Sequence, residues 1–200
     1  MILVVCALAA ELAGFVAPSG VEVYASGIGP VEAAAGTARR LAEGPYRAVI
    51  SAGIAGAMRG RALVGDAVAI GDETLARFGR EDGRALALPE GARLEETVAA
   101  DPQLIAQTAA SDLPLLRGLT VSEVTCSDAT ARALGERYGT DVESMEGFAV
   151  LRACQRAGIP ALEVRGISNY IGARERAEWD FAAGARAAAD ALDAVLVHLL

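Results

Sequence analysis

The chain has 200 residues, of which 53% are hydrophobic, and its formal net charge is −8. This length and hydrophobic content fit a single domain over residues 1–200 with a well-buried core. The acidic balance, with no basic stripe, argues against nucleic acid as a partner. No stretch reaches the roughly 18 uncharged apolar residues of a membrane span, so we expect no membrane partner and a cytoplasmic location.

The sulfur and imidazole side chains restrict the chemistry further. The three cysteines, Cys6, Cys126 and Cys154, are far apart and lack the spacing of metal ligands. They are typical of small buried residues in a reducing compartment. The only histidine, His198, is close to the end of the sequence, which argues against Ser-His-Asp and Cys-His mechanisms.

The first half of the chain alternates short apolar runs with helical patterns. Ile2 to Ala7 is a continuous apolar run, typical of a strand buried on both faces. Pro30 fits the first position of a helix that extends from Val31 to about Glu43. The other elements expected here are a short helix at 9–13, strands at 21–25, 48–52 and 68–70, and an exposed excursion at 77–93.

The second half continues this alternation. The expected helices cover about 102–110, 128–138 and the stretch from about 176 to the end, and the expected strands cover 119–124 and 161–167. Strands that alternate with helices indicate α/β architecture. We therefore expect a single three-layer αβα domain with a central, mostly parallel or mixed sheet.

The stretch 142–147 holds two carboxylates, Glu143 and Glu146, where an apolar run turns into a helix. From Met145 onward, apolar residues recur at helical spacing, and Ser144 fits the N-cap. Glu146 then lies in the first turn, where the helix dipole favours a negative charge by roughly 0.3–1 kcal/mol. An ionised carboxylate only accepts hydrogen bonds, so it suits a ligand with paired hydroxyls such as a ribose. The alternative is that Glu146 merely complements the helix dipole.

Other polar and small residues fall at the carboxyl ends of predicted strands, where ligands of open α/β sheets bind. They are Glu11, Gly27, Gly29, Gly53, Gly56, Ser168 and Asn169. The glycines have an alternative explanation, because they also permit tight turns. Gly27-x-Gly29 lacks the third glycine of a dinucleotide fingerprint, and no Gly-Lys-Ser/Thr of a P-loop occurs.

Five segments occur in one order across most of the chain. They are Ala7 to Glu11, Ser26 to Pro30, Ala52 to Gly56 with Val64 to Asp66 after it, Val142 to Glu146, and Val164 to Asn169. Together they resemble the nucleoside phosphorylase/nucleosidase superfamily, and within its hydrolytic branch the futalosine hydrolases of the alternative menaquinone pathway. The strongest pointers are the stretches 142–147 and 165–179.

The resemblance implies a phosphorylase/nucleosidase-like fold and an N-glycosyl hydrolase that releases hypoxanthine and dehypoxanthine futalosine. It implies a small nucleoside substrate, neither a metal nor another cofactor, and a homodimer or larger homo-oligomer. Among catalytic residues, it implies that Glu11 activates water, Glu146 holds the ribose hydroxyls and Asn169 faces the purine. The implied substrate-binding residues are Ile54, Ala55, Gly56, Met145, Thr125 and Phe148.

The side chain at position 169 bears on which base leaves. In the related methylthioadenosine/S-adenosylhomocysteine nucleosidases an aspartate occupies this position. Asn169 is a neutral amide with one acceptor and two donors, so it can donate to the O6 and N7 side of a 6-oxopurine. Polar groups left unpaired in such a pocket discriminate strongly, which favours hypoxanthine over adenine. The alternative is that Asn169 caps the turn that follows it.

Hydrolysis is favoured over phosphorolysis because phosphate needs cationic or backbone donors. No Arg or Lys precedes Arg39, whereas Glu11 would repel phosphate and can accept a proton from water. A methylthioadenosine/S-adenosylhomocysteine nucleosidase, a purine nucleoside phosphorylase and a non-enzymatic purine-nucleoside storage protein remain alternatives. Arg165 could pair with Glu143 or Glu146. The roles of Arg174, Arg176 and Trp179 stay open between the purine end, a subunit contact and a solvated loop.

Overall fold

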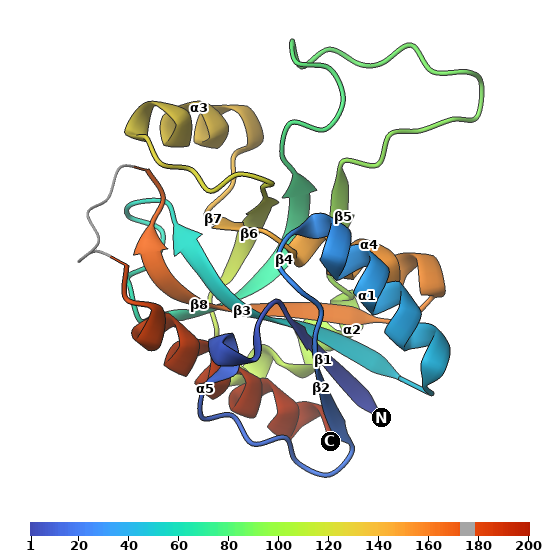
Figure 1. Ribbon diagram of the computed structural model, residues 1–200, viewed down its shortest axis with the longest axis vertical. Helices are drawn as coiled ribbons and strands as arrows, with labels where there is room; N and C mark the ends of the chain where they lie inside the picture. Colours follow the sequence, from blue (N-terminus) through green and yellow to red (C-terminus); the bar gives the residue numbers. More distant parts are fainter. Residues whose placement is uncertain (173–178) are drawn as a thin grey trace.

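A mixed sheet with helices on both faces forms the centre of the molecule, in a computed structural model that describes residues 1–172 and 179–200 (Figure 1). The strands of the described residues are β1 (Ile2–Cys6), β2 (Val21–Ala25), β3 (Ala48–Ala57), β4 (Ala67–Leu75), β5 (Thr97–Ala99), β6 (Leu115–Thr120), β7 (Val142–Ser144) and β8 (Ala161–Tyr170). The helices are α1 (Pro30–Glu43), α2 (Pro102–Gln107), α3 (Asp128–Tyr138), α4 (Gly147–Ala157) and α5 (Phe181–Leu199), with short 3-10 helices η1 (Ala9–Leu12) and η2 (Ala109–Ser111). The expected three-layer α/β architecture is confirmed.

The strand order brings the carboxyl ends of several strands to one edge. The order is β2-β1-β3-β7-β6-β4-β5, and β8 pairs in parallel with β3 and antiparallel with β4. Strands β3, β8, β4, β6 and β7 therefore close a ring, and β1 and β2 extend in parallel from its β3 side. β7 joins β3 only at the end of that strand, where Gly56 pairs with Glu143. This register sets the stretch 142–146 beside Gly56.

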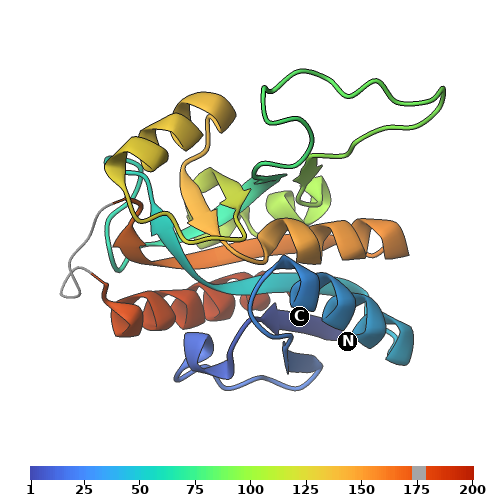
Figure 2. The same cartoon turned by 45° about the horizontal axis from the view of Figure 1, so that its top comes forward.

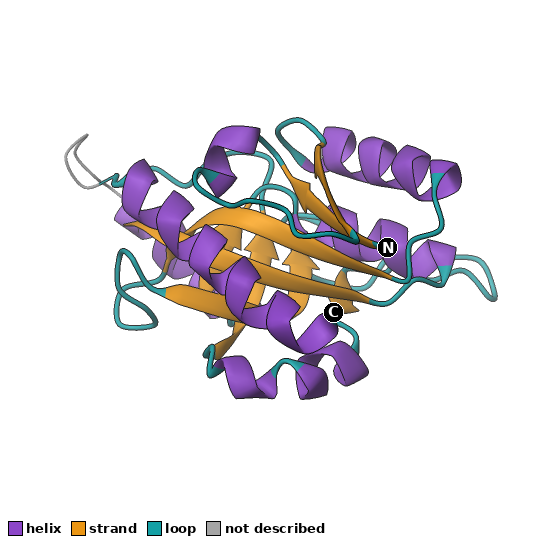
Figure 3. Ribbon diagram, turned by 90° about the horizontal axis from the view of Figure 1, so that it is seen from below, coloured by secondary structure: helices purple, strands orange, loops and turns teal. Residues whose placement is uncertain are grey.

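The two faces of the sheet bury different apolar clusters because side chains alternate along each strand. In β1, Ile2, Val4 and Cys6 face a cluster that includes α5, whereas Leu3 and Val5 face one formed largely by α1 and α4. Figure 1 shows α1 and α4 on the side of the sheet opposite α5, and Figure 2 shows the green loop between β4 and β5 extending away from the rest of the molecule. Figure 3 shows the helix that ends at the C-terminus lying across the strands. The helices cover the two faces of the sheet, so the edge formed by the strand ends is where a functional site can form.

Local signals in the sequence place α3 and α5. α3 spans the predicted residues because the Ser127 hydroxyl accepts from the amide of Thr130 at 3.1 Å, while Gly139 takes a left-handed φ of 62° and ends the helix. The start predicted for the last helix, near Arg176, lies outside the described residues. From Phe181 onward α5 follows the predicted pattern. Residues 77–93 are exposed, as expected, within the long loop between β4 and β5 (Figure 1).

Several predicted boundaries are wrong because strand pairing overrides the local pattern. The strand expected at 119–124 is β6, which ends at Thr120 because its pairing with β4 covers 115–120. β5 and β7 were not expected, since each has only three residues. Ser144 ends β7 and is not the N-cap of α4; Glu146 takes that position. The strand expected at 48–52 is β3, which continues to Ala57. No helix in the described part of the chain is long and apolar enough to cross a membrane.

Candidate active site

A cavity of about 220 Å³ lies where the carboxyl ends of the strands meet. It brings together seven of the predicted catalytic and substrate-binding residues, which are Glu11, Ile54, Ala55, Gly56, Met145, Glu146 and Asn169. The remaining lining residues are Ala7, Leu8, Ile28, Val124, Glu143, Ser144, Ser168, Trp179 and Phe181. Residues from segments far apart in the sequence thus share one cavity.

Glu11 enters the cavity from η1, directly after β1. Its Oε2 accepts from the amide of Ala7 at 3.2 Å. A Cβ on Gly53 would lie 2.7 Å from that oxygen and 2.8 Å from Nη1 of Arg165, so only glycine lets both side chains approach β3 here. Burial raises the pKa of Glu11, the guanidinium of Arg165 opposes this shift, and the charge of Glu146 adds to it. The result is a buried carboxyl group with a raised proton affinity beside a fixed cation.

Arg165 lies beneath the cavity, on β8, and is fully buried. Its Nε donates to Glu163 at 2.7 Å, and its terminal nitrogens donate to the hydroxyl of Ser51 at 3.2 Å and the carbonyl of Ile54 at 3.5 Å. The sequence left its partner open between Glu143 and Glu146. The ion pair formed is with neither of them, because Glu163 lies on the same strand and the same face.

Glu146 approaches the cavity from the start of α4. Its Oε1 accepts from the amide of Gly29 at 2.8 Å, which ties two segments that are 117 residues apart. The loop can turn this way because Gly27 and Gly29 adopt φ values of 100° and 93°, which favour glycine. Ile28 is thereby placed against the cavity. Since one oxygen holds the loop, the other, Oε2, is the one left for a ligand.

Asn169 lies near the end of β8, beside an irregularity in the pairing with β3. The register shifts between Ala55 and Gly56, which re-aims the strand at the cavity. The Oδ1 of Asn169 lies 2.9 Å from the hydroxyl of Ser168, and its Nδ2 donates to the carbonyl of Tyr170 at 3.0 Å. A Cβ on Gly56 would lie 2.9 Å from Nδ2. The amide is thus held with its oxygen engaged, and its second N–H has no partner among the residues that the structure describes.

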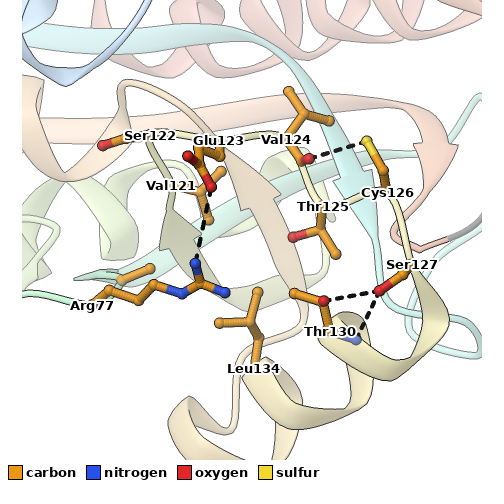
Figure 4. Close-up of a pocket in the computed structure, with 11 residues that line it drawn as sticks. Arg77, Val121, Ser122, Glu123, Val124, Thr125, Cys126, Ser127, Thr130 and Leu134 are labelled. Carbon is orange, nitrogen blue, oxygen red and sulfur yellow. Dashed lines mark hydrogen bonds and ion pairs between the residues drawn. The ribbon is translucent and has the colours of Figure 1, made fainter. Parts of the chain in front are cut away.

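Two predicted substrate-binding residues do not line this cavity. Thr125 donates through its amide (3.1 Å) and its hydroxyl (2.5 Å) to Glu143, and it lines a neighbouring cavity of about 470 Å³ (Figure 4). Val124 lines both cavities. Phe148 packs in the apolar cluster with α1 and α4, because it lies on the same face of α4 as Leu151 and Cys154.

Ile28 was not singled out from the sequence, although its place between Gly27 and Gly29 could have indicated it. Trp179, whose role the sequence left open, lines the cavity with half of its surface exposed. Glu163 also has a sequence signal, since it is a charge inside a buried apolar strand, which requires a partner. Arg174 and Arg176 lie outside the described residues.

The sequence is similar to known proteins over nearly its whole length. The model of the Phosphorylase superfamily matches residues 14–200. A futalosine hydrolase of Streptomyces coelicolor is 36% identical over 183 residues, which cover 88% of this chain and 78% of that protein. A futalosine hydrolase of Thermus thermophilus is 36% identical over 161 residues, which cover 77% of this chain and 71% of the relative.

Solved structures share the fold at lower sequence identity. The 5′-methylthioadenosine/S-adenosylhomocysteine nucleosidase of Neisseria meningitidis, in complex with methylthio-immucillin-A, gives a TM-score of 0.83 at 19% identity, with 100% of this chain and 99% of that chain covered. The futalosine hydrolase of Helicobacter pylori gives a TM-score of 0.84 at 16% identity, with 98% and 97% covered. At these identities the likeness concerns the fold alone.

Proposed function

Because the chain belongs to the phosphorylase superfamily, we propose that it is a single nucleosidase domain over residues 1–200 that hydrolyses the N-glycosidic bond of futalosine and releases hypoxanthine. The observation that carries the proposal is the meeting of Glu11 and Glu146 in one cavity. Two carboxylates around one sugar can serve both a water molecule and the hydroxyls of the ring. The similarity to futalosine hydrolases supports this substrate.

Glu11 is the proposed base. In its ionised form it accepts a proton from the attacking water, and a raised pKa makes it a better acceptor near neutral pH. Arg165 approaches the same glycine, Gly53, and keeps a positive charge near the base. Among the described residues that line the cavity there is no Lys or Arg, so this wall offers no cationic donor to phosphate. This favours water as the nucleophile.

Glu146 is proposed to hold the ribose hydroxyls through its Oε2, while Met145 packs on the sugar. As the N-glycosidic bond breaks, positive charge develops on the sugar, and nearby carboxylates stabilise it as they do in O-glycosidases. The negative charge that leaves with the base is stabilised by hydrogen-bond donors. The free N–H of Asn169 is the proposed donor, toward the O6 and N7 side of hypoxanthine. Ile54, Ala55 and Gly56 line the path of the base.

The main competing activity is hydrolysis of methylthioadenosine or S-adenosylhomocysteine, which nucleosidases of the same fold carry out. Asn169 favours a 6-oxopurine instead, because one N–H of its amide has a partner in Tyr170 and the second can donate to the O6 and N7 side of the base. A purine nucleoside phosphorylase would have to bind phosphate beside the sugar, and a storage protein would bind the nucleoside without cleaving it.

One assay separates these activities. The protein is incubated with futalosine, methylthioadenosine and inosine, each with and without phosphate, and free base is measured. We expect hypoxanthine from futalosine at a rate that does not depend on phosphate. Phosphate dependence would indicate the phosphorylase, adenine release the methylthioadenosine nucleosidase, and binding without turnover the storage protein.

We also propose that the protein acts as a cytoplasmic homodimer or larger homo-oligomer that associates through α1 and α4. A groove of about 740 Å³ lies between them, lined largely by small apolar residues, and Val31 is 76% exposed beside it. Phe78, from the excursion at 77–93, also lines this groove and is 41% exposed. Apolar surface of this kind marks interaction sites.

Light scattering after size exclusion tests the association. Val31→Glu should shift the protein toward the monomer. The matched control is Val197→Glu on α5, where the valine is 78% exposed away from the groove and the substitution should leave the mass unchanged. A wild-type monomer at high concentration would refute the proposed assembly.

A further inference from the structure

Two carboxylates outside the cavity are fully buried and face one another. Glu73 lies on β4 and Glu163 on β8, and these strands are antiparallel neighbours. The Oε2 of Glu73 accepts from the hydroxyl of Thr120 at 2.8 Å. The Oε1 of Glu163 accepts from Nε of Arg165 at 2.7 Å. Each carboxylate therefore has one oxygen anchored by a donor on the sheet.

The second oxygen of each carboxylate accepts from no protein donor among the described residues, although both atoms are buried. These atoms are Oε1 of Glu73 and Oε2 of Glu163. A Cβ on Gly147 would lie 2.5 Å from each of them, so the two oxygens converge on the same point at the start of α4. A single proton between them satisfies both, because a protonated carboxyl donates one hydrogen bond and an ionised one accepts it.

The charges around the pair require such a proton. Arg165 is the cation that lies beside Glu163. Its positive charge already interacts with three carboxylates, which are Glu163 on β8, Glu146 at the start of α4 and Glu11 on η1. A further buried negative charge on Glu73 would have no partner of its own, which is strongly unfavourable. Burial and the neighbouring charge of Glu163 raise the pKa of Glu73 well above its usual range. Since Arg165 contacts Glu163 directly, the proton belongs on Glu73.

We propose that Glu73 carries one proton that it donates to Glu163, and that Glu163 thereby remains the anion that holds the Arg165 guanidinium beside Glu11. Glu163 is then a positioning residue, since it does not line the cavity and acts through Arg165. The effect of Glu163 on catalysis rests on the proposed hydrolysis of futalosine. Without the anion on Glu163, Arg165 is free to turn toward Glu11 and form an ion pair with its carboxylate. Such an ion pair lowers the ability of Glu11 to take a proton from water.

The proton has a consequence for stability that does not depend on activity. A carboxyl group whose pKa is raised on folding binds more protons in the folded state. Its contribution to the free energy of unfolding is complete below the ordinary pKa of 4.5 and is lost as the pH rises toward the raised pKa of Glu73. Glu73→Gln resembles the protonated acid in shape and donor, so it should remove this part of the pH dependence.

Infrared spectroscopy tests the proton directly. At neutral pH the wild-type protein should show the carbonyl stretch of a buried protonated carboxylic acid. The band should persist in Glu11→Gln and in the exposed control Glu136→Gln, and disappear in Glu73→Gln. A wild-type spectrum without a protonated-acid band, or a band that survives in Glu73→Gln, would overturn the proposal. The wild-type spectrum alone is informative if a variant does not fold.

Steady-state kinetics with futalosine test the positioning role. Glu163→Gln should lower kcat by about tenfold or more with KM within about twofold, and its kcat should be at least about tenfold below that of Glu73→Gln. It should also shift the acidic limb of the pH profile, because Arg165 is no longer held. Equal losses in the two variants, or a loss confined to KM, would contradict the role. If the wild-type protein does not hydrolyse futalosine, the proposed function fails, while the spectrum still decides on the proton.

Discussion

The two ends of the cavity are held by different means. At the acidic end, Glu11 and Glu146 are both charged groups, and Glu146 is fixed by the amide of Gly29, 117 residues away. At the amide end, Asn169 is neutral and is fixed by its own neighbours, Ser168 and Tyr170. On the proposed roles, the hold on the ribose therefore depends on a contact between distant segments, whereas the choice of base depends on a few consecutive residues. A single substitution near Asn169 should therefore be able to change the base preference. A single substitution elsewhere should not restore activity that is lost at the acidic end.

The acidic end should respond most strongly to loss of a charge. Glu146→Gln keeps an acceptor for the amide of Gly29 but removes the negative charge that faces the sugar. We expect kcat to fall by on the order of 10²- to 10³-fold with the fold intact. Steady-state kinetics and circular dichroism measure both properties, with the exposed Glu136→Gln as a control. Near-normal kcat in Glu146→Gln would remove the role assigned to this residue.

The space between the base and its cation is the next most sensitive point. Gly53→Ala places a methyl group 2.7 Å from Oε2 of Glu11 and 2.8 Å from Nη1 of Arg165, so both side chains must move. We expect kcat to fall by roughly 10²-fold, since small misplacements of catalytic groups have effects of that size. The control is Gly135→Ala in α3, where a Cβ meets Met58 at an ordinary 3.5 Å and helix propensity favours alanine. Equal activity of the two variants would show that this spacing is unimportant.

The amide end should change selectivity with a smaller loss of rate. Asn169→Asp supplies a group that can accept from a 6-amino substituent once it is ionised and can donate when it is protonated. We expect the ratio of hypoxanthine release to adenine release to shift by about tenfold toward adenine, measured with matched 6-oxo and 6-amino nucleosides. An unchanged ratio would show that Asn169 does not select the base.

The pH dependence gives the smallest effect. Burial raises the pKa of Glu11 above its ordinary value of 4.5, more than Arg165 lowers it. Because the ionised form is the proposed base, kcat/KM should fall as the pH decreases through this raised value. The acidic limb of the profile of kcat/KM against pH should therefore lie above pH 4.5. A limb at or below the ordinary value would indicate a solvated base.

Residues at both ends of the cavity could be predicted from the sequence. Glu11, Glu146 and Asn169 each follow a strand or open a helix, which predicts that they lie together, and all three line the cavity. β7 was missed because three residues carry no periodic signal and its pairing with both β3 and β6 is a property of the whole sheet. Phe148, which the resemblance implied at the substrate, lies in the core with Leu151 and Cys154.

Of the contacts among the buried charged residues, one could have been predicted from the sequence and another could not. The sequence left the partner of Arg165 open between Glu143 and Glu146, whereas its neighbour on the same face of β8, Glu163, is its partner. Residues that are two apart on a strand lie on the same side of the sheet, so this pair could have been predicted from the sequence. The contact of Glu73 with Glu163 could not be predicted from the sequence, since it depends on the antiparallel pairing of β4 with β8.

The central claim is that Glu11 and Glu146 act on one sugar with a water molecule between base and ring. A crystal structure of the Glu11→Gln variant with futalosine bound tests it most directly, because the substrate should survive in the crystal. We predict the ribose hydroxyls within hydrogen-bond distance of Oε2 of Glu146, and the side chain at position 11 beside a water that faces the sugar carbon of the N-glycosidic bond. A nucleoside bound outside this cavity, or with its sugar away from both side chains, would contradict the account.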